Sequence, residues 1–205
     1  KTASAIWAAD YLIEQNKVYK VLIICPLSIM QSAWQADLFK FAMHRKVGIA
    51  YGDRDKRVAV IESDAQFVII NYDGVDIVAD AIAKQNFDLI IIDEANAYKT
   101  ITTKRWRTLS HIITPRTWIW MMTGTPAAQS PLDAYGLAKL CVPSRTPHLY
   151  TAFRDVVMYQ FSRFKWIPKP QAQGIVHNLL QPAIRFEKKD CIDLPDVTHT
   201  SRSHH

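Results

Sequence analysis

Two patterns of apolar residues alternate along the chain. Four short runs are continuously apolar and rich in β-branched residues, which predicts strands buried on both faces of a parallel sheet: residues 21–25, 67–70, 89–92 and 118–122. Apolar residues recur at helical spacing in residues 3–15, 29–42 and 101–113. The pattern also allows a strand at residues 47–50 and a helix at residues 74–84. This alternation predicts an α/β fold, with three α/β/α layers around a mainly parallel sheet.

The tryptophans fall mostly within these patterns. Trp7 shares its helical spacing with Ile6 and Ala9, and Trp34 shares its spacing with Met30. The others are Trp106, Trp118, Trp120 and Trp166. We expect packing in the core, and not stacking on nucleobases, to be the role of most of them.

The character of the sequence changes after about residue 143. Prolines interrupt the helical pattern there, and basic and aromatic residues intermix. We therefore expect residues 1–141 to form the main lobe and residues 142–197 to form a Pro-rich, basic, helical extension and connector. Residues 198–205 lack apolar anchors and are expected to be a disordered tail or a tag.

Composition narrows the class of protein. A chain of 205 residues, of which 49% are hydrophobic, can bury a substantial core. It has no run of 18 apolar residues, so we expect a soluble intracellular protein with no membrane partner. Cys25, Cys141 and Cys191 lack the spacing of a zinc site or a disulfide framework. Paired ligand spacing is also lacking for His44, His111, His148, His177 and His199.

The charge is moderately basic, with a formal net charge of +6. No Asp or Glu occurs between residues 95 and 132, where the basic residues are Lys99, Lys104, Arg105, Arg107 and Arg116. A second basic stretch contains Arg163, Lys165 and Lys169. Such runs can simply be solvated faces, but their position beside the motifs below favours contact with phosphates.

Residues 89–92 deliver Asp93 and Glu94 to the carboxyl end of a buried strand. Open parallel sheets bind ligands at this end. In a nucleotide hydrolase the first carboxylate would hold Mg²⁺, and the second would orient or deprotonate the attacking water. The alternative is that Asp93 only caps a helix that begins after the strand.

Two further segments suit the same chemistry. Lys1 and Thr2 open a helix, as the Lys-Ser/Thr end of a phosphate-binding loop does, where backbone N–H groups and the helix dipole meet phosphates. The strand expected at residues 118–122 is followed by Thr123-Gly124-Thr125-Pro126. This second segment is either a simple turn or a group of hydroxyls near nucleotide or DNA.

Five motifs follow one another along the chain: Lys1-Thr2, the segment Cys25-Pro26-Leu27-Ser28 followed by Trp34, Asn71-Tyr72-Asp73, Asp93-Glu94-Ala95-Asn96, and Thr123-Gly124-Thr125-Pro126. Together and in this order they resemble the first lobe of Swi/Snf-type superfamily-two DNA-dependent ATPases. The similarity covers residues 1–141 and extends to a connector-like segment at residues 185–190 with Leu194-Pro195. The resemblance implies a RecA-like, P-loop NTPase lobe and an ATP-driven translocase on double-stranded DNA.

The resemblance also implies roles for individual residues. Lys1 would contact the β- and γ-phosphates of ATP, Thr2 and Asp93 would hold Mg²⁺, and Glu94 would be the general base. Asn96, Thr123, Gly124 and Thr125 would couple nucleotide state to DNA grip. Contacts to DNA are implied for Pro26, Leu27, Ser28, Asn71 and Tyr72, and the acid-free stretch adds Lys104, Arg105 and Arg107.

Departures from the family pattern set further expectations. Asn96 stands where the family typically has histidine, and residues 127–130 differ from the usual continuation. In the family a glycine-rich loop would precede Lys1, and a second RecA-like lobe would supply arginine fingers. We therefore expect no ATP turnover by the 205-residue chain alone. Two alternatives remain: another superfamily-two helicase or restriction-system motor, and a non-catalytic nucleic-acid-binding module.

Overall fold

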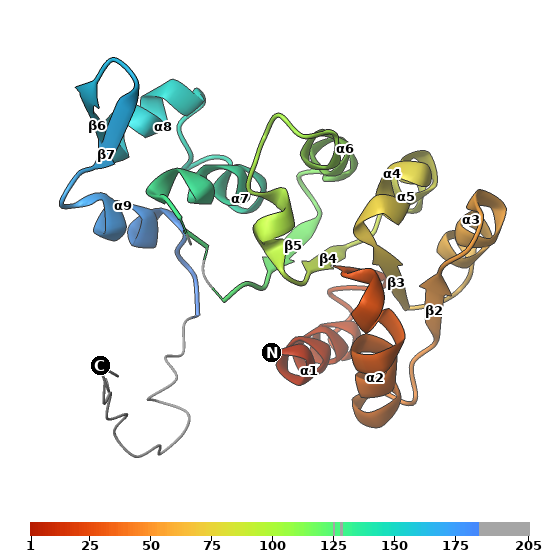
Figure 1. The fold of residues 1–205 in the computed structure, drawn as a ribbon. Coiled ribbons are helices and arrows are strands. Elements are labelled where there is room, and N and C mark those ends of the chain that lie inside the picture. Colours follow the sequence, from red (N-terminus) through yellow and green to blue (C-terminus); the bar gives the residue numbers. More distant parts are fainter. Residues whose placement is uncertain (125, 128, 185–205) are drawn as a thin grey trace, which may run out of the picture.

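The computed structural model, which describes residues 1–124, 126–127 and 129–184, contains a five-stranded parallel sheet (Figure 1). Its strands are β1 (Val21–Cys25), β2 (Val47–Ala50), β3 (Phe67–Asn71), β4 (Leu89–Ile92) and β5 (Trp118–Met121). They lie in the order β2-β3-β1-β4-β5. All five strands were predicted from the sequence, and three of them, β1, β2 and β4, have the predicted bounds at both ends.

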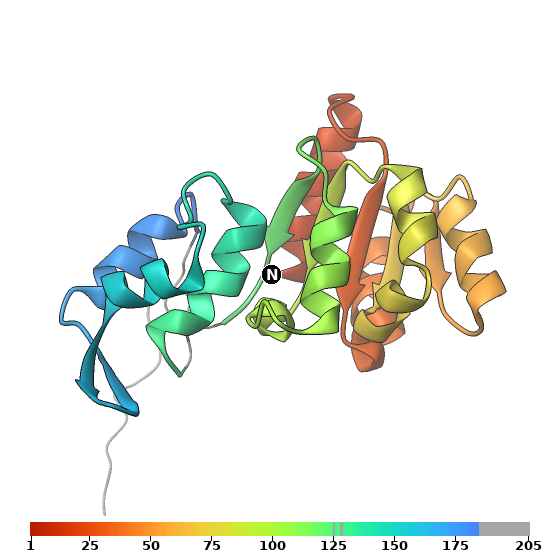
Figure 2. The same ribbon diagram turned by 90° about the horizontal axis from the view of Figure 1, so that it is seen from above.

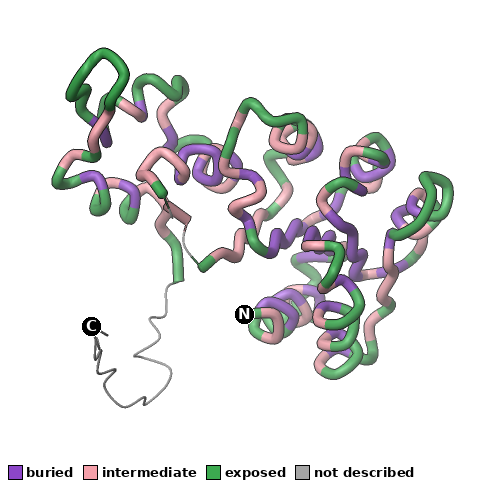
Figure 3. Tube along the Cα trace, viewed as in Figure 1, coloured by how far each residue is buried: buried purple, intermediate pink, exposed green. Residues whose placement is uncertain are grey.

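The three central strands carry the continuous apolar runs because both of their faces are covered. Every residue of β1, β3 and β4 is buried (Figure 3). β5 differs, since it is an edge strand that is buried only in part, with Trp118 46% exposed. The prediction of a fully buried strand at residues 118–122 was therefore wrong in this respect.

Helices cover both faces of the sheet, which confirms the three-layer α/β/α fold (Figure 1). One face holds α1 (Thr2–Glu14), η1 (Leu27–Ile29), the π-helix η2 (Met30–Gln35) and α2 (Ala36–Phe41). The opposite face holds α3 (Arg54–Glu62), α4 (Tyr72–Ile77), α5 (Ala79–Gln85), η3 (Ala95–Tyr98) and α6 (Lys104–Ile112). None of the helices within these described parts is long and apolar enough to cross a membrane.

Helix ends differ from the sequence prediction for local reasons. The segment expected as one helix over residues 29–42 is divided among a 3₁₀ turn, a π turn and α2. Residues 74–84 contain parts of two helices, because Val78 leaves helical geometry at φ −124°. Thr103 caps α6 by accepting from the Trp106 amide at 3.3 Å.

Trp7 is a correction to the expected core. It lies on α1 but is 57% exposed, whereas Ile6 and Ala9 are fully buried. Its ring packs edge-on against Phe41, with 5.2 Å between ring centroids. By contrast, Trp34 is fully buried, as its spacing predicted.

The remaining described residues form a smaller unit beside β5. It contains η4 (Pro131–Asp133), α7 (Ala134–Cys141), α8 (Tyr150–Val157), the hairpin β6 (Met158–Ser162) and β7 (Lys165–Pro168), and α9 (Ala172–Leu179). A third hydrophobic cluster holds it together, including Tyr135, Phe153 and Val176. The hairpin was not anticipated in the extension that was expected to be helical. The boundary near residue 141 stays a prediction, and residues 185–190, Leu194-Pro195 and the tail lie outside the described residues.

The strand order creates a switch point between β1 and β4. The chain leaves β1 toward the face that carries η2 and α2, and it leaves β4 toward the face that carries η3 and α6. Ligands of open α/β sheets bind in the crevice beyond the carboxyl ends of two such strands. The fold therefore directs attention to the residues that follow Cys25 and Ile92.

Candidate nucleotide and nucleic-acid site

The carboxyl ends of the strands bring the sequence motifs into one row. Cys25 pairs in register with Asn71, and Ile24 pairs with Ile92. The Asp93 amide donates to the Ile24 carbonyl at 2.9 Å, so Asp93 continues the ladder beside β1. Its neighbour on the other side is the end of β5, where the Met122 amide donates to Ile92 at 2.8 Å.

Asp93 is a buried carboxylate at the switch point, only 8% exposed. Its Oδ2 accepts from the Trp34 indole Nε1 at 3.0 Å, and its Oδ1 accepts from the Glu94 amide at 3.0 Å. No Lys, Arg or His forms a salt bridge with Asp93 in the part of the chain that the structure describes. Buried carboxylates are normally paired or bound to a metal ion. The environment of Asp93 therefore fits a bound divalent cation.

The alternative role of Asp93 as a simple helix cap is not what the geometry provides. The helix after β4 is the short 3₁₀ turn η3, and the residue before it is Glu94, which makes no side-chain capping bond. The Asp93 carboxylate instead holds the indole of Trp34, 59 positions earlier in the chain. That indole is presented from the π turn η2, a kind of turn that is frequent at functional sites.

Glu94 combines exposure with unusual backbone geometry. Its φ of 47° and ψ of 55° lie in the left-handed region, which non-glycine residues seldom occupy. Such residues cost about 1–3 kcal/mol and cluster at active sites. A glutamate held this way, exposed and next to a buried aspartate, has the access to water that a general base needs.

Lys1 and Thr2 lie at the amino end of α1, where the Ala5 amide donates to the Lys1 carbonyl at 3.0 Å. A methyl group placed on Gly124 would lie 4.0 Å from the Lys1 ammonium. The lysine therefore reaches the segment after β5, which adjoins the end of β4. Thr2 and Asp93 offer hydroxyl and carboxylate oxygens, the ligands that Mg²⁺ prefers.

The coupling residues implied by the resemblance lie on two adjacent segments. Asn96 belongs to η3, and Thr123 and Gly124 follow β5. The segments are joined where the Ala95 amide donates to the Met122 carbonyl at 3.0 Å. Thr125 lies outside the described residues.

Tyr72 connects the end of β3 to the two acidic residues. Its hydroxyl donates to the Asp93 carbonyl at 2.5 Å and approaches the Glu94 carbonyl at 3.3 Å. Burial, followed by the nearby charge of Asp93, raises the pKa of Tyr72 well above its usual value, so the phenol stays a donor. The same causes raise the pKa of the buried Cys25 thiol to about 12.

Asn71 is buried, and a residue that the sequence analysis missed fixes its side chain. Arg57 donates to Asn71 Oδ1 at 3.0 Å, to the Ala50 carbonyl at 2.7 Å and to the Gly52 carbonyl at 2.8 Å. The guanidinium is itself buried, and these neutral acceptors replace its water. Asn71 is therefore held by the protein, whereas Leu27 and Ser28, at the end of β1, are exposed.

The basic residues of α6 lie close to this row. Arg105 donates to Asp73 at 2.8 Å and lies over the Tyr72 ring, 4.9 Å from its centroid. Lys104 and Arg107 are exposed on the same helix. Within the acid-free stretch, α6 thus lies next to the residues that follow β3.

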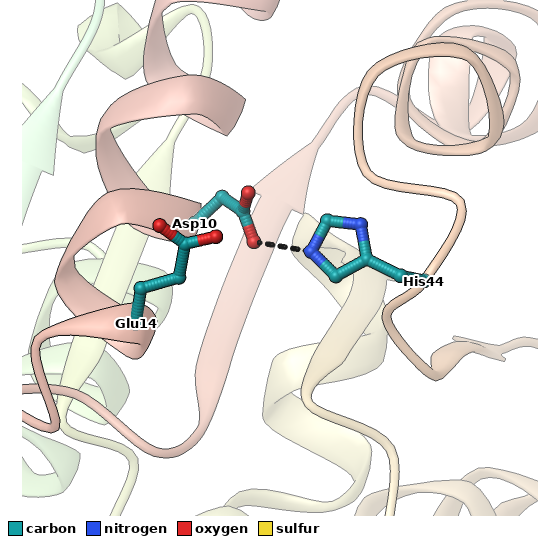
Figure 4. Close-up of side chains that lie close together, drawn as sticks. All are labelled: Asp10, Glu14 and His44. Carbon is teal, nitrogen blue, oxygen red and sulfur yellow. Dashed lines mark hydrogen bonds and ion pairs between the residues drawn. The ribbon is translucent and has the colours of Figure 1, made fainter.

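A separate cluster of side chains joins α1 to the loop after α2 (Figure 4). His44 Nε2 lies 3.2 Å from Asp10 Oδ1, and Glu14 lies within reach of both. Arg45 Nε donates to the same Asp10 oxygen at 2.6 Å. The cluster already contains a compensating guanidinium, so we interpret it as an ion-pair group that fixes α1. Nothing in the spacing of His44 pointed to it.

Comparison with known proteins supports the interpretation of the fold. The family described as "SNF2-related domain" matches residues 1–199. "Helicase SWR1" of Yarrowia lipolytica is 30% identical over 150 residues, which cover 70% of this chain and 8% of that protein. "Chromatin-remodeling ATPase INO80" of Candida albicans is 29% identical over 157 residues, covering 70% of this chain and 11% of that protein. The chain thus spans about a tenth of the length of these relatives.

Two solved structures from Sulfolobus solfataricus share the fold. The "SWI2/SNF2 ATPase core in complex with dsDNA" has a TM-score of 0.66 and 24% identity, and the match covers 76% of this chain and 31% of that chain. The "SWI2/SNF2 ATPase core domain" has a TM-score of 0.67 and 20% identity, covering 93% and 38%. The predicted RecA-like lobe and the predicted family are both confirmed: the chain belongs to the SNF2-related domain family.

Proposed function

We propose that this chain is the first motor lobe of an ATP-dependent translocase that moves along double-stranded DNA. The observation that carries the proposal is the pair Asp93 and Glu94 at the switch point. The Asp93 carboxylate is buried with no cationic partner among the described residues, and Glu94 is exposed and held in a left-handed conformation. Two relatives, one named a helicase and the other an ATPase, support ATP hydrolysis as the chemistry of this site.

In this proposal the residues of the row divide the work of ATP hydrolysis. Lys1 binds the β- and γ-phosphates at the positive end of α1, and Thr2 and Asp93 hold Mg²⁺. The bound ion would neutralise charge on the phosphates. Trp34 fixes the Asp93 carboxylate through its indole N–H, so that the carboxylate needs no reorientation when Mg²⁺ binds. Glu94 takes a proton from the attacking water.

Residues at the same edge of the sheet would hold DNA. Leu27, Ser28, Lys104 and Arg107 are exposed and could meet the phosphate backbone. Pro26 begins the same turn, whereas Asn71, Tyr72 and Arg105 are engaged within the protein and would support this surface from beneath. Asn96, Thr123, Gly124 and Thr125 would couple nucleotide state to this grip. The second RecA-like lobe is the expected partner, and the inactivity of the 205-residue chain alone stays a prediction.

Phosphate release by the full-length protein tests the catalytic assignment. Glu94→Gln should lower DNA-stimulated release by about 10²- to 10⁴-fold while ATP binding persists. Glu62→Gln, an equivalent change of an exposed glutamate on α3, is the control. Undiminished release by Glu94→Gln would refute the role of Glu94. Triplex displacement without strand displacement would distinguish translocation from the unwinding expected of other superfamily-two helicases.

Salt dependence tests the proposed DNA surface. Nonspecific binding of duplex DNA, with dissociation constants of roughly 10⁻⁴ to 10⁻⁶ M, should weaken as salt rises. Lys104→Gln and Arg107→Gln should each reduce the slope of log affinity against log salt by about one. Lys84→Gln, on the exposed end of α5, should leave the slope unchanged. Equal slopes for all three variants would remove α6 from the DNA surface.

A further inference from the structure

The β6–β7 hairpin presents large aromatic side chains to solvent. Tyr159 is 44% exposed, Phe161 is 64% exposed and Phe164, at the turn, is 88% exposed. The hairpin projects from the smaller unit at the end remote from β2 (Figure 1). Figure 2 shows that it extends toward the same side of the molecule as η3 and the carboxyl ends of the sheet strands. Clustered exposed aromatic residues of this kind usually mark a binding surface.

The base of the hairpin is fixed to the protein. Met158 is buried in the third cluster, and Trp166 packs against that cluster. Arg154 lies over the Trp166 ring at 4.0 Å from its centroid, and the Lys169 amide donates to the Val157 carbonyl at 2.9 Å. The exposed rings are therefore carried on an anchored, ordered ribbon, which reduces the entropy lost when a ligand binds.

Each of the two exposed phenylalanines of the hairpin has a cation beside it. The Arg163 guanidinium lies 5.4 Å from the Phe164 ring centroid, and the Lys165 ammonium lies 5.6 Å from the Phe161 ring centroid. Rings and positive charges therefore alternate along the turn. This arrangement offers two kinds of contact within one short segment: a flat apolar face and a charge for an anion.

The surroundings of the hairpin also favour an anionic partner. Between residues 134 and 184 the only acidic residue is Asp155, which pairs with Arg154 at 2.9 Å. The basic residues of this stretch are Lys139, Arg145, Arg154, Arg163, Lys165 and Lys169. An acidic peptide would use the charges but leave the phenylalanine faces unmatched. Unpaired nucleotides use both, because bases stack on aromatic rings and phosphates meet the cations.

We propose that the β6–β7 hairpin is a binding surface for unpaired nucleotides of DNA. Bases stack on Phe161 and Phe164, and the flanking phosphates contact Arg163 and Lys165. Paired bases inside a duplex cannot offer their faces to these rings, so the surface distinguishes single strands from duplex. Only the choice of DNA over RNA rests on the proposed function; the nucleotide chemistry follows from the hairpin itself.

Fluorescence anisotropy of the full-length protein with labelled oligonucleotides tests the proposal. For a single strand of about 16 nucleotides, the double variant Phe161→Ala/Phe164→Ala should weaken binding by about tenfold or more. Duplex binding should change by less than about twofold, because its affinity comes from phosphate contacts. Phe164→Trp should retain single-strand binding. Phe39→Ala is the control, since Phe39 is 72% exposed on α2, away from the hairpin.

Four outcomes would overturn the proposal: unchanged single-strand binding by the double variant, an equal loss for duplex and single strand, tighter binding of an RNA of the same length, or displacement of single strands by polyglutamate at equal charge. The proposed motor function fails separately. Hairpin-dependent single-strand binding without DNA-stimulated ATP hydrolysis would refute the motor and leave the hairpin. Duplex-stimulated hydrolysis, together with hairpin variants that bind single strands normally, would refute the hairpin proposal and leave the motor function.

Discussion

Replacement of Trp34 by phenylalanine should affect both stability and the proposed metal site. The substitution removes the indole N–H that donates to Asp93 Oδ2 at 3.0 Å, from a fully buried position. A hydrogen bond to a charged group contributes about 1.5–3 kcal/mol. The smaller ring also leaves unfilled volume, so the free energy of unfolding should fall by about 2–4 kcal/mol. Urea denaturation followed by circular dichroism measures this loss.

The same substitution should weaken Mg²⁺ binding, because the Asp93 carboxylate loses the group that orients it. Loss of such a supporting bond typically lowers metal affinity by about 10- to 100-fold. The measurement is the Mg²⁺ concentration that gives half-maximal ATP hydrolysis by the full-length protein, at a temperature at which every variant is folded. This Mg²⁺ concentration should be about 10- to 100-fold higher for Trp34→Phe than for the unaltered protein.

Trp106→Phe provides the matched control. Its indole also donates one hydrogen bond, at 2.9 Å, but to the neutral carbonyl of Gly136. This bond contributes only about 0.5–1.5 kcal/mol, and its loss should leave the Mg²⁺ requirement unchanged. If the two variants show the same Mg²⁺ requirement, the indole of Trp34 does not orient a metal ligand and the reasoning is refuted.

Three further predictions follow from individual residues. Glu94→Gly should be more stable in urea than Glu94→Ala by about 1 kcal/mol, because only glycine occupies φ 47° freely; equal stabilities would contradict the backbone strain. Gly136→Ala should lower the free energy of unfolding by about 1–3 kcal/mol, because its methyl group would overlap the Lys99 carbonyl. Gly174→Ala, with open space in α9, should instead raise the free energy of unfolding by about 0.5–1 kcal/mol. An unchanged stability of Gly136→Ala would count against the close approach of α7 to the Lys99 carbonyl. Cys25 and Cys141, whose pKa values burial raises to about 12, should resist iodoacetamide at pH 8 until urea unfolds the chain, as peptide mass spectrometry would show. Because their folded pKa values are raised, the stability they contribute is complete below about pH 8.5 and is lost as pH rises toward 12.

Burial explains how much of the sheet could be predicted from sequence. Central strands are covered on both faces, so β1 and β4 leave uninterrupted apolar runs with clear ends. α3 left no such signal, because it buries little besides Ile61 and the guanidinium-bearing Arg57. The β6–β7 hairpin was missed for a different reason. Tyr159 and Phe161 alternate with Gln160 and Ser162, but this run is short and its aromatic residues face solvent instead of the core.

Sequence alone could predict only the part of the candidate site that a single motif forms. Asp93 and Glu94 adjoin a buried strand and were found from that alone. The bonds of Trp34 to Asp93, and of Arg57 to Asn71, join residues separated by other elements, and nothing in their local sequence specifies the contact. The approach of Lys1 to the Gly124 segment could be predicted only with the knowledge that β5 lies beside β4.

α7 takes part in two cores at once, and this sets an order in which the molecule can open. Its Leu137 and Leu140 belong to the core on the face of the sheet that carries α3 to α6, while Ala134 and Tyr135 belong to the third hydrophobic cluster. The third cluster can lose its packing while α7 stays docked on the sheet, but detachment of α7 would remove part of both. Amide hydrogen exchange should therefore proceed first in α8 and α9, later in α7 and last in the central strands. The unit that carries the hairpin can thus loosen, or vary between relatives, without disturbing the strand ends that hold Asp93.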